Sequence, residues 1–248
     1  MNYDEIRGAF SEKPLLTRSD LVDYIRSGKP EIKETTAGWI LYDMRKNDVI
    51  DRVAHNTYML HTNVKPLPDF NPDLSDEAID ITNFIKNRYP EVFFIVWETL
   101  AYNEFANHQM WRNFIFVEVE KWLEESVFNA LYENTDYTVL YKPSKKEITT
   151  YSSNVTVSVL TLTSEAPVTD WHAKLEKMLV DLFANPLIDR IVSPGDYPGI
   201  YKESFLKYSI NLKMMLRYAR RRGKADKIIS FMVNSANIKM VEGMPVND

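Results

Sequence analysis

The sequence contains no cysteine, which excludes disulfide bonds, thiol nucleophiles and every cysteine-ligated zinc or iron–sulfur site. Any metal ion would have to be held by histidines and carboxylates. The four histidines, His55, His61, His108 and His172, are too far apart in the sequence to form a metal-binding motif. We therefore predict no metal, no cofactor and no self-contained catalytic site.

Glycine is also scarce, and its seven residues are scattered along the chain. Their spacing provides neither the G-x-G-x-x-G fingerprint of dinucleotide-binding folds nor a phosphate-binding loop. The Gly-Ser turn that is typical of nucleotidyltransferases is absent as well. The first two absences exclude dinucleotide-binding and phosphate-loop enzymes, and the third argues against an ordinary nucleotidyltransferase.

Long apolar runs are missing too. No segment approaches the roughly 18 consecutive apolar residues of a membrane helix, and the first residues lack the basic and then apolar pattern of a secretory signal. We expect a cytoplasmic protein with no membrane partner. The net charge of -5 argues against nucleic-acid binding by the whole surface, because affinity for phosphates requires clustered Lys and Arg.

The hydrophobic pattern predicts a mixed α/β (α+β) fold with two domains of unequal size. Residues 1–61 show three short helical segments and then a hairpin pattern, which is the order of elements in a winged helix-turn-helix. Residues 62–74 carry three prolines and are predicted to form a stiff linker. Residues 75–248 are predicted to form a larger domain, a mixed sheet flanked by helices with a helical C-terminus.

Short sequence signals mark where the expected helices begin. Thr17, with Asp20 three residues later, predicts a capping box at the start of the second helix. Thr35 or Thr36 is expected to cap the third helix. Ser75 is expected to cap the first helix of the larger domain.

The third helix of a winged helix enters the major groove of DNA. Here it offers side chains to base edges, and its ends and the hairpin offer side chains to phosphates. The predicted DNA-binding residues are Lys33, Thr35, Thr36, Trp39, Arg45, Lys46, Arg52 and Asn56. Because residues 1–61 hold nine basic and ten acidic residues, binding requires the positive charges to gather on one face. A winged helix that binds protein is the alternative.

The densest positive charge lies near the C-terminus, where residues 202–227 hold nine basic and two acidic residues. Such a cluster favours an anionic partner, either an acidic protein surface or a nucleic acid. A solvated helix face whose arginines pair with carboxylates is the alternative. The predicted partner-binding residues are Arg217, Arg220, Arg221, Arg222 and Lys224.

Glu118 and Glu120 have the spacing of paired metal-binding carboxylates on a strand. With Asp181, they make a divergent metal-dependent nuclease or nucleotidyltransferase the alternative function. The preferred interpretation is that both glutamates lie at the end of a strand with their side chains in solvent, as acidic residues usually do.

Three segments carry a resemblance to a known family: residues 56–60 (NTYML), 175–182 (LEKMLVDL) and 218–224 (YARRRGK). Together with the N-terminal winged helix, they resemble the AbiEi-type antitoxin family over nearly the whole chain. The resemblance implies a bacterial antitoxin of a type IV toxin–antitoxin system. Its winged helix would repress its own operon by binding double-stranded operator DNA, and its C-terminal domain would counter a cognate nucleotidyltransferase-like toxin.

Overall fold

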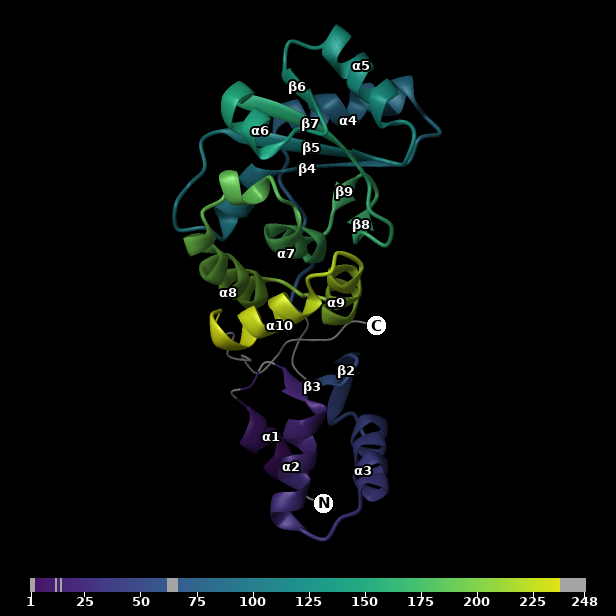
Figure 1. Ribbon diagram of the computed structural model, residues 1–248, viewed down its shortest axis with the longest axis vertical. Coiled ribbons are helices and arrows are strands. Elements are labelled where there is room, and N and C mark those ends of the chain that lie inside the picture. Colours follow the sequence, from purple (N-terminus) through teal and green to yellow (C-terminus); the bar gives the residue numbers. More distant parts are fainter. Residues whose placement is uncertain (1–2, 12, 14, 62–66, 237–248) are drawn as a thin grey trace.

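The computed structural model describes residues 3–11, 13, 15–61 and 67–236. In its N-terminal part, three helices accompany a small antiparallel sheet with the strand order β1-β3-β2. This arrangement is the predicted winged helix-turn-helix (Figure 1). The elements are α1 (Tyr3–Phe10), β1 (Leu16–Thr17), α2 (Arg18–Gly28), α3 (Glu34–Lys46), β2 (Ile50–Ala54) and β3 (Thr57–Leu60).

The capping box of α2 is confirmed. The Asp20 backbone N–H donates to Thr17 Oγ1 at 3.0 Å, and the Thr17 backbone N–H donates to the Asp20 carboxylate at 2.8 Å. Ser75 also caps α4 (Asp76–Arg88) as expected, because its hydroxyl accepts from the Ala78 backbone N–H at 3.2 Å. Both helices therefore begin where a side chain satisfies a free backbone donor.

The prediction that Thr35 or Thr36 caps α3 is wrong. The helix already begins at Glu34, and its N-cap residue, Lys33, provides no side-chain hydrogen bond. A negative charge is favourable in the first turn of a helix, and the Glu34 carboxylate is also held by ion pairs with two arginines of α2. The start of α3 is therefore stabilised by charge interactions of Glu34 and has no side-chain cap.

The larger C-terminal part alternates strands and helices before it becomes helical, as predicted. After α4, its elements are β4 (Phe94–Glu98), η1 (Thr99–Glu104), β5 (Asn113–Val119), α5 (Glu124–Asn134), β6 (Thr138–Tyr141), α6 (Lys145–Tyr151), β7 (Val155–Thr161), β8 (Val168–Thr169), β9 (His172–Ala173), α7 (Leu175–Ala184), η2 (Ile188–Arg190), η3 (Pro194–Asp196), α8 (Tyr197–Lys207), α9 (Leu212–Arg221) and α10 (Ala225–Asn234).

These strands form one mixed sheet in the order β6-β7-β5-β4-β9-β8. Strands β5, β6 and β7 run parallel to one another, and β4 is antiparallel to β5. One face of the sheet packs against α4 and α5 in a first hydrophobic core. The other face packs against α7 and the C-terminal helices in a second core (Figure 1). Strand β5 is therefore covered on both faces.

The N-terminal part shares this second core. Leu15, Val53 and Met59 are buried in the same hydrophobic cluster as Met215 and Leu216 of α9, and β2 contacts α9.

Within the predicted linker, residues 62–66 lie outside the described residues, and residues 67–74 contain no helix or strand. Among the helices that the structure describes, none is long and apolar enough to cross a membrane.

Candidate functional site

The predicted DNA-binding residues lie on α3 and on the β2–β3 hairpin. Ala37, Leu41 and Met44 fix the inner side of α3 against the N-terminal core, which leaves the opposite side to solvent. Trp39 is 72% exposed and packs edge-on against the Tyr42 ring at 5.9 Å. We call the predicted residues, all of which are exposed, the α3–wing face: Lys33, Thr35, Thr36, Trp39, Arg45, Lys46, Arg52 and Asn56.

The cations of the N-terminal part divide into two groups. Lys13 pairs with Asp20 at 3.1 Å and Arg26 pairs with Glu34 at 2.9 Å, while Arg18 also pairs with Glu34. The cations that make no ion pair with any described residue include Lys33, Arg45, Lys46 and Arg52. Positive charge available to a phosphate backbone is therefore present on the α3–wing face, although the N-terminal part as a whole is slightly acidic.

The hairpin exposes Arg52 because its strand pairing is irregular. Strict alternation would place Arg52 on the same side as Ile50, but the register shifts between Arg52 and Ala54 in a β-bulge. Ile50 and Val53 are buried as a result, and Arg52 is exposed. The turn is closed by Asn56 with a φ of 52°, a conformation that asparagine tolerates better than most residues.

The C-terminal basic cluster divides at the end of α9. Arg217, Arg220 and Arg221 are exposed, and the Arg217 Nε atom lies 3.5 Å from the Glu165 carboxylate. Lys224 is half-buried at the N-cap of α10. These four cations form one candidate surface for an anionic partner, which we call the α9 patch.

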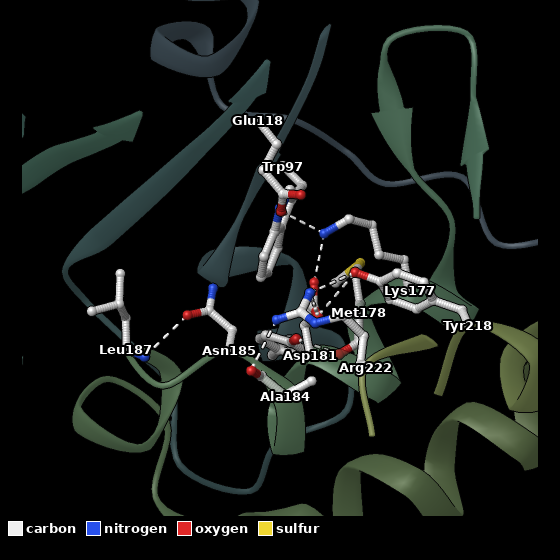
Figure 2. A network of polar contacts seen from close by, with 11 residues as sticks. Trp97, Glu118, Lys177, Met178, Asp181, Ala184, Asn185, Leu187, Tyr218 and Arg222 are labelled. Atoms are coloured by element: carbon white, nitrogen blue, oxygen red, sulfur yellow. Dashed lines mark hydrogen bonds and ion pairs between the residues drawn. The ribbon is translucent and has the colours of Figure 1, made fainter. Parts of the chain in front are cut away.

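Arg222 differs from its neighbours because its guanidinium points inward, as Figure 2 shows. Its Nη1 atom donates to Asp181 Oδ1 at 2.9 Å and to the Tyr218 hydroxyl at 2.7 Å, and its Nη2 atom donates to the Ala184 carbonyl at 2.9 Å. The structure thus separates Arg222 from the α9 patch and gives it internal partners that neutralise its charge.

Lys177 lies at the centre of the same buried network and is 0% exposed. Its Nζ atom lies 2.5 Å from both Glu118 Oε1 and Asp181 Oδ2, and 4.8 Å from the centre of the Trp97 ring. Burial alone would lower the pKa of Lys177, but the carboxylates of Asp181 and Glu118 raise it above its ordinary value. Lys177 is therefore a buried ammonium ion held by two carboxylates (Figure 2).

The prediction that Glu118 faces solvent is wrong, because its side chain is 3% exposed. It lies on β5, both faces of which are covered, so alternate residues cannot reach water. Glu118 Oε1 also accepts from Trp97 Nε1 at 2.8 Å, whereas Glu120 accepts from the Phe93 backbone N–H. The two glutamates therefore have different partners.

The predicted metal-dependent alternative needs Glu118, Glu120 and Asp181 to share one site. Instead, the Lys177 ammonium occupies the space between Glu118 and Asp181. Across the residues that the structure describes, no group of three or more His, Asp or Glu side chains is arranged to hold a metal ion. These contacts give no support to the metal-dependent alternative.

Comparison with known proteins assigns the chain to a family. A family model described as "Family of unknown function (DUF6577)" matches residues 36–238, which is most of the chain. The chain belongs to this family. No curated protein matches the chain. The match to DUF6577 begins within α3 and includes the hairpin, the sheet and every residue of the buried network.

Sequence reasoning missed most of that network in this DUF6577 member. Trp97, Tyr218 and Lys177 were not identified as site residues, and Arg222 was grouped with the surface cations. One signal was present: Lys177 and Asp181 are spaced i, i+4 in a helix whose neighbouring positions are mostly apolar. Two opposite charges on such a helix indicate a buried ion pair.

Proposed function

We propose that this protein is a transcriptional regulator that binds double-stranded DNA through the α3–wing face. The observation that carries the proposal is that all eight residues of this face are exposed and its four cations make no ion pair with other described residues. Phosphates can therefore be contacted without first breaking an internal ion pair, a step that would reduce the gain from each contact.

The residues of the face match the two kinds of contact in protein–DNA complexes, those to base edges and those to the phosphate backbone. Thr35, Thr36 and Trp39 occupy the outward side of α3, where side chains of a helix in the major groove meet base edges and thymine methyl groups. Arg45 and Lys46 end the helix, and Arg52 projects from the wing, where these motifs contact the backbone. The proposal places the protein in the cytoplasm and assigns it no catalytic turnover.

Replacing Arg45 and Arg52 together by alanine tests this interface. The binding constant for a duplex that spans the sequence upstream of the protein's own gene should fall. The slope of its logarithm against the logarithm of salt concentration should decrease by about 2, because each lost phosphate contact removes roughly one counterion release. Fluorescence anisotropy over a series of salt concentrations measures both quantities.

The matched control replaces Lys13 and Arg26 by alanine. It removes the same charge, but from cations that are already paired with Asp20 and Glu34. This variant should keep the salt slope of the wild type. An Arg45→Ala, Arg52→Ala variant with an unchanged slope would show that these arginines do not contact DNA.

We further propose that the protein is an AbiEi-type antitoxin whose C-terminal part binds a nucleotidyltransferase-like toxin through the α9 patch. The resemblance of three separate segments supports the family, and the exposed arginines support an anionic partner surface. The proposal expects a neighbouring gene whose product has a Gly-Ser turn and paired carboxylates on a strand.

Charge reversal tests the partner surface. Arg220→Glu combined with Arg221→Glu should weaken binding to the co-expressed neighbour at least about tenfold, because like charges then face each other. Affinity is measured by titration calorimetry. Lys146→Glu with Lys202→Glu, which changes two exposed cations elsewhere, should bind as the wild type does. The antitoxin proposal would be contradicted if the two double variants weakened binding equally. It would also be contradicted if the product of the neighbouring gene lacked the Gly-Ser turn and the paired carboxylates.

A further inference from the structure

A small pocket of about 220 Å³ lies at the carboxyl ends of the three parallel strands β5, β6 and β7. In open α/β sheets, ligands bind in the crevice outside the carboxyl ends of the strands. The pocket borders the buried network through Glu118 and Arg222, and it is independent of the α3–wing face. Its lining is Glu118, Lys142, Pro143, Leu160, Thr161, Thr163, Asn185, Pro186, Leu187 and Arg222.

The charges around this pocket are already compensated. Lys142 Nζ lies 3.0 Å from the Glu124 carboxylate, which also accepts from the Thr161 hydroxyl. Burial alone would raise the pKa of Glu124, but these hydrogen bonds lower it to about 2, so Glu124 is ionised at neutral pH. Glu118 pairs with Lys177, as described above. A charged ligand would therefore bring an unpaired charge into the pocket, which favours an uncharged ligand.

Two polar groups of the pocket have hydrogen-bonding capacity left over. Asn185 is 7% exposed, and its Oδ1 atom accepts from the Leu187 backbone N–H at 3.0 Å. The Asn185 Nδ2 atom makes no hydrogen bond with any other described residue. Figure 2 shows this nitrogen pointing away from Leu187, toward the side of the network where Trp97 and Glu118 lie.

Glu118 supplies the complementary group. Its hydrogen bonds from Trp97 and Lys177 both go to Oε1, so Oε2 keeps its capacity to accept. Neither atom is among the fully buried polar atoms that lack a partner in the described part of the chain, so both keep some accessible surface. A donor and an acceptor of this kind that line one cavity indicate a ligand that offers the reverse pair. The rest of the lining combines two leucines and two prolines, which suit the faces of a flat ring, with two threonines, Lys142 and Arg222.

We propose that this pocket binds a nucleobase, a small uncharged planar group whose edge carries a donor and an acceptor side by side. The donor of the base faces Glu118 Oε2, and its acceptor receives a hydrogen bond from Asn185 Nδ2. The pocket is smaller than the about 300–1,000 Å³ that is usual for drug-sized ligands, in keeping with a single base. The base can come from a free nucleoside or from single-stranded RNA, and the experiment separates these sources.

The test titrates the full chain with adenosine, guanosine, cytidine and uridine in turn, and with a single-stranded RNA that contains all four bases. Binding is followed by ¹⁵N NMR through the side-chain NH2 signals of asparagine. The Asn185→Asp variant identifies the Asn185 signal, because it keeps the acceptor for the Leu187 N–H and removes the donor. At least one nucleoside should shift this signal saturably, and that nucleoside should bind Asn185→Asp at least tenfold more weakly.

Asn154→Asp is the matched control, because Asn154 is exposed in a loop away from the pocket lining. It should bind the nucleoside as the wild type does. If Asn185→Asp fails to fold, triple-resonance NMR assigns the Asn185 side-chain signal and the titration of the wild-type protein decides alone. If the RNA shifts the Asn185 signal and no free nucleoside does, the base that the pocket binds comes from single-stranded RNA. A wild-type Asn185 signal that no nucleoside and no RNA shifts would overturn the proposal, as would an Asn185→Asp variant with wild-type affinity.

Discussion

Replacing Lys177 by methionine should destabilise the folded protein by about 3–5 kcal/mol. The substitution keeps most of the side-chain volume and removes the only charge that lies between the carboxylates of Glu118 and Asp181 among the described residues. Both carboxylates are almost completely buried, so water solvates them much less well than the lost ammonium did. The free energy of unfolding, measured by urea denaturation and circular dichroism, gives the effect.

Two variants make this result interpretable. Lys213→Met changes an exposed lysine of α9 and should alter stability by less than about 0.5 kcal/mol. Adding Glu118→Gln to Lys177→Met removes the one charge left without a partner, because Asp181 stays paired with Arg222, so it should recover part of the loss. If Lys177→Met is no more harmful than Lys213→Met, the network does not contribute to stability as its geometry indicates.

Trp97→Ala should have a similarly large effect, about 3–5 kcal/mol, because it leaves a cavity in the second core. The Trp97 ring is 2% exposed and stacks on Phe116 with the ring centres 4.5 Å apart. Trp97→Phe keeps a ring in that position but removes the donor to Glu118, so we expect a smaller loss of about 1–3 kcal/mol. Thermal and urea unfolding measure both variants.

Trp111→Ala is the control for this pair, because Trp111 is 72% exposed and its removal should change stability by less than about 0.5 kcal/mol. The comparison of the stability losses of Trp97→Phe and Trp97→Ala is the informative result. Should Trp97→Phe prove as destabilising as Trp97→Ala, the hydrogen bond to Glu118 would outweigh the packing of the ring. Should neither variant lose stability, the network and its aromatic neighbour would be independent of the fold.

Local patterns in the sequence predicted much of the fold. The starts of α2 and α4 agree with those expected, because Thr17 and Ser75 are clear capping signals. The start of α3 could not be predicted, since Glu34 is held by arginines of a different helix.

The two candidate sites differ in how far the sequence could reveal them. The outward residues of α3 follow from helical periodicity, whereas Arg52 is exposed by the β-bulge of the hairpin. The network could not be found in this way, because Trp97, Glu118 and Asp181 come from three elements that only the sheet and α7 bring together. Contacts between residues that are far apart in the chain produce no recognisable pattern in a single sequence. For this reason Glu118 was expected in solvent.

The core shared by the hairpin and α9 has a mechanical consequence. Moving residues 1–61 away from the larger part would expose Val53 and Met59 to water, at a cost of about 1.5–3 kcal/mol for each large side chain. The strand that carries Arg52 is therefore anchored to the helix that carries Arg220 and Arg221. If the proposed function holds, the shared core links the proposed partner surface on α9 to the proposed DNA-binding hairpin, so binding at one surface is expected to affect binding at the other.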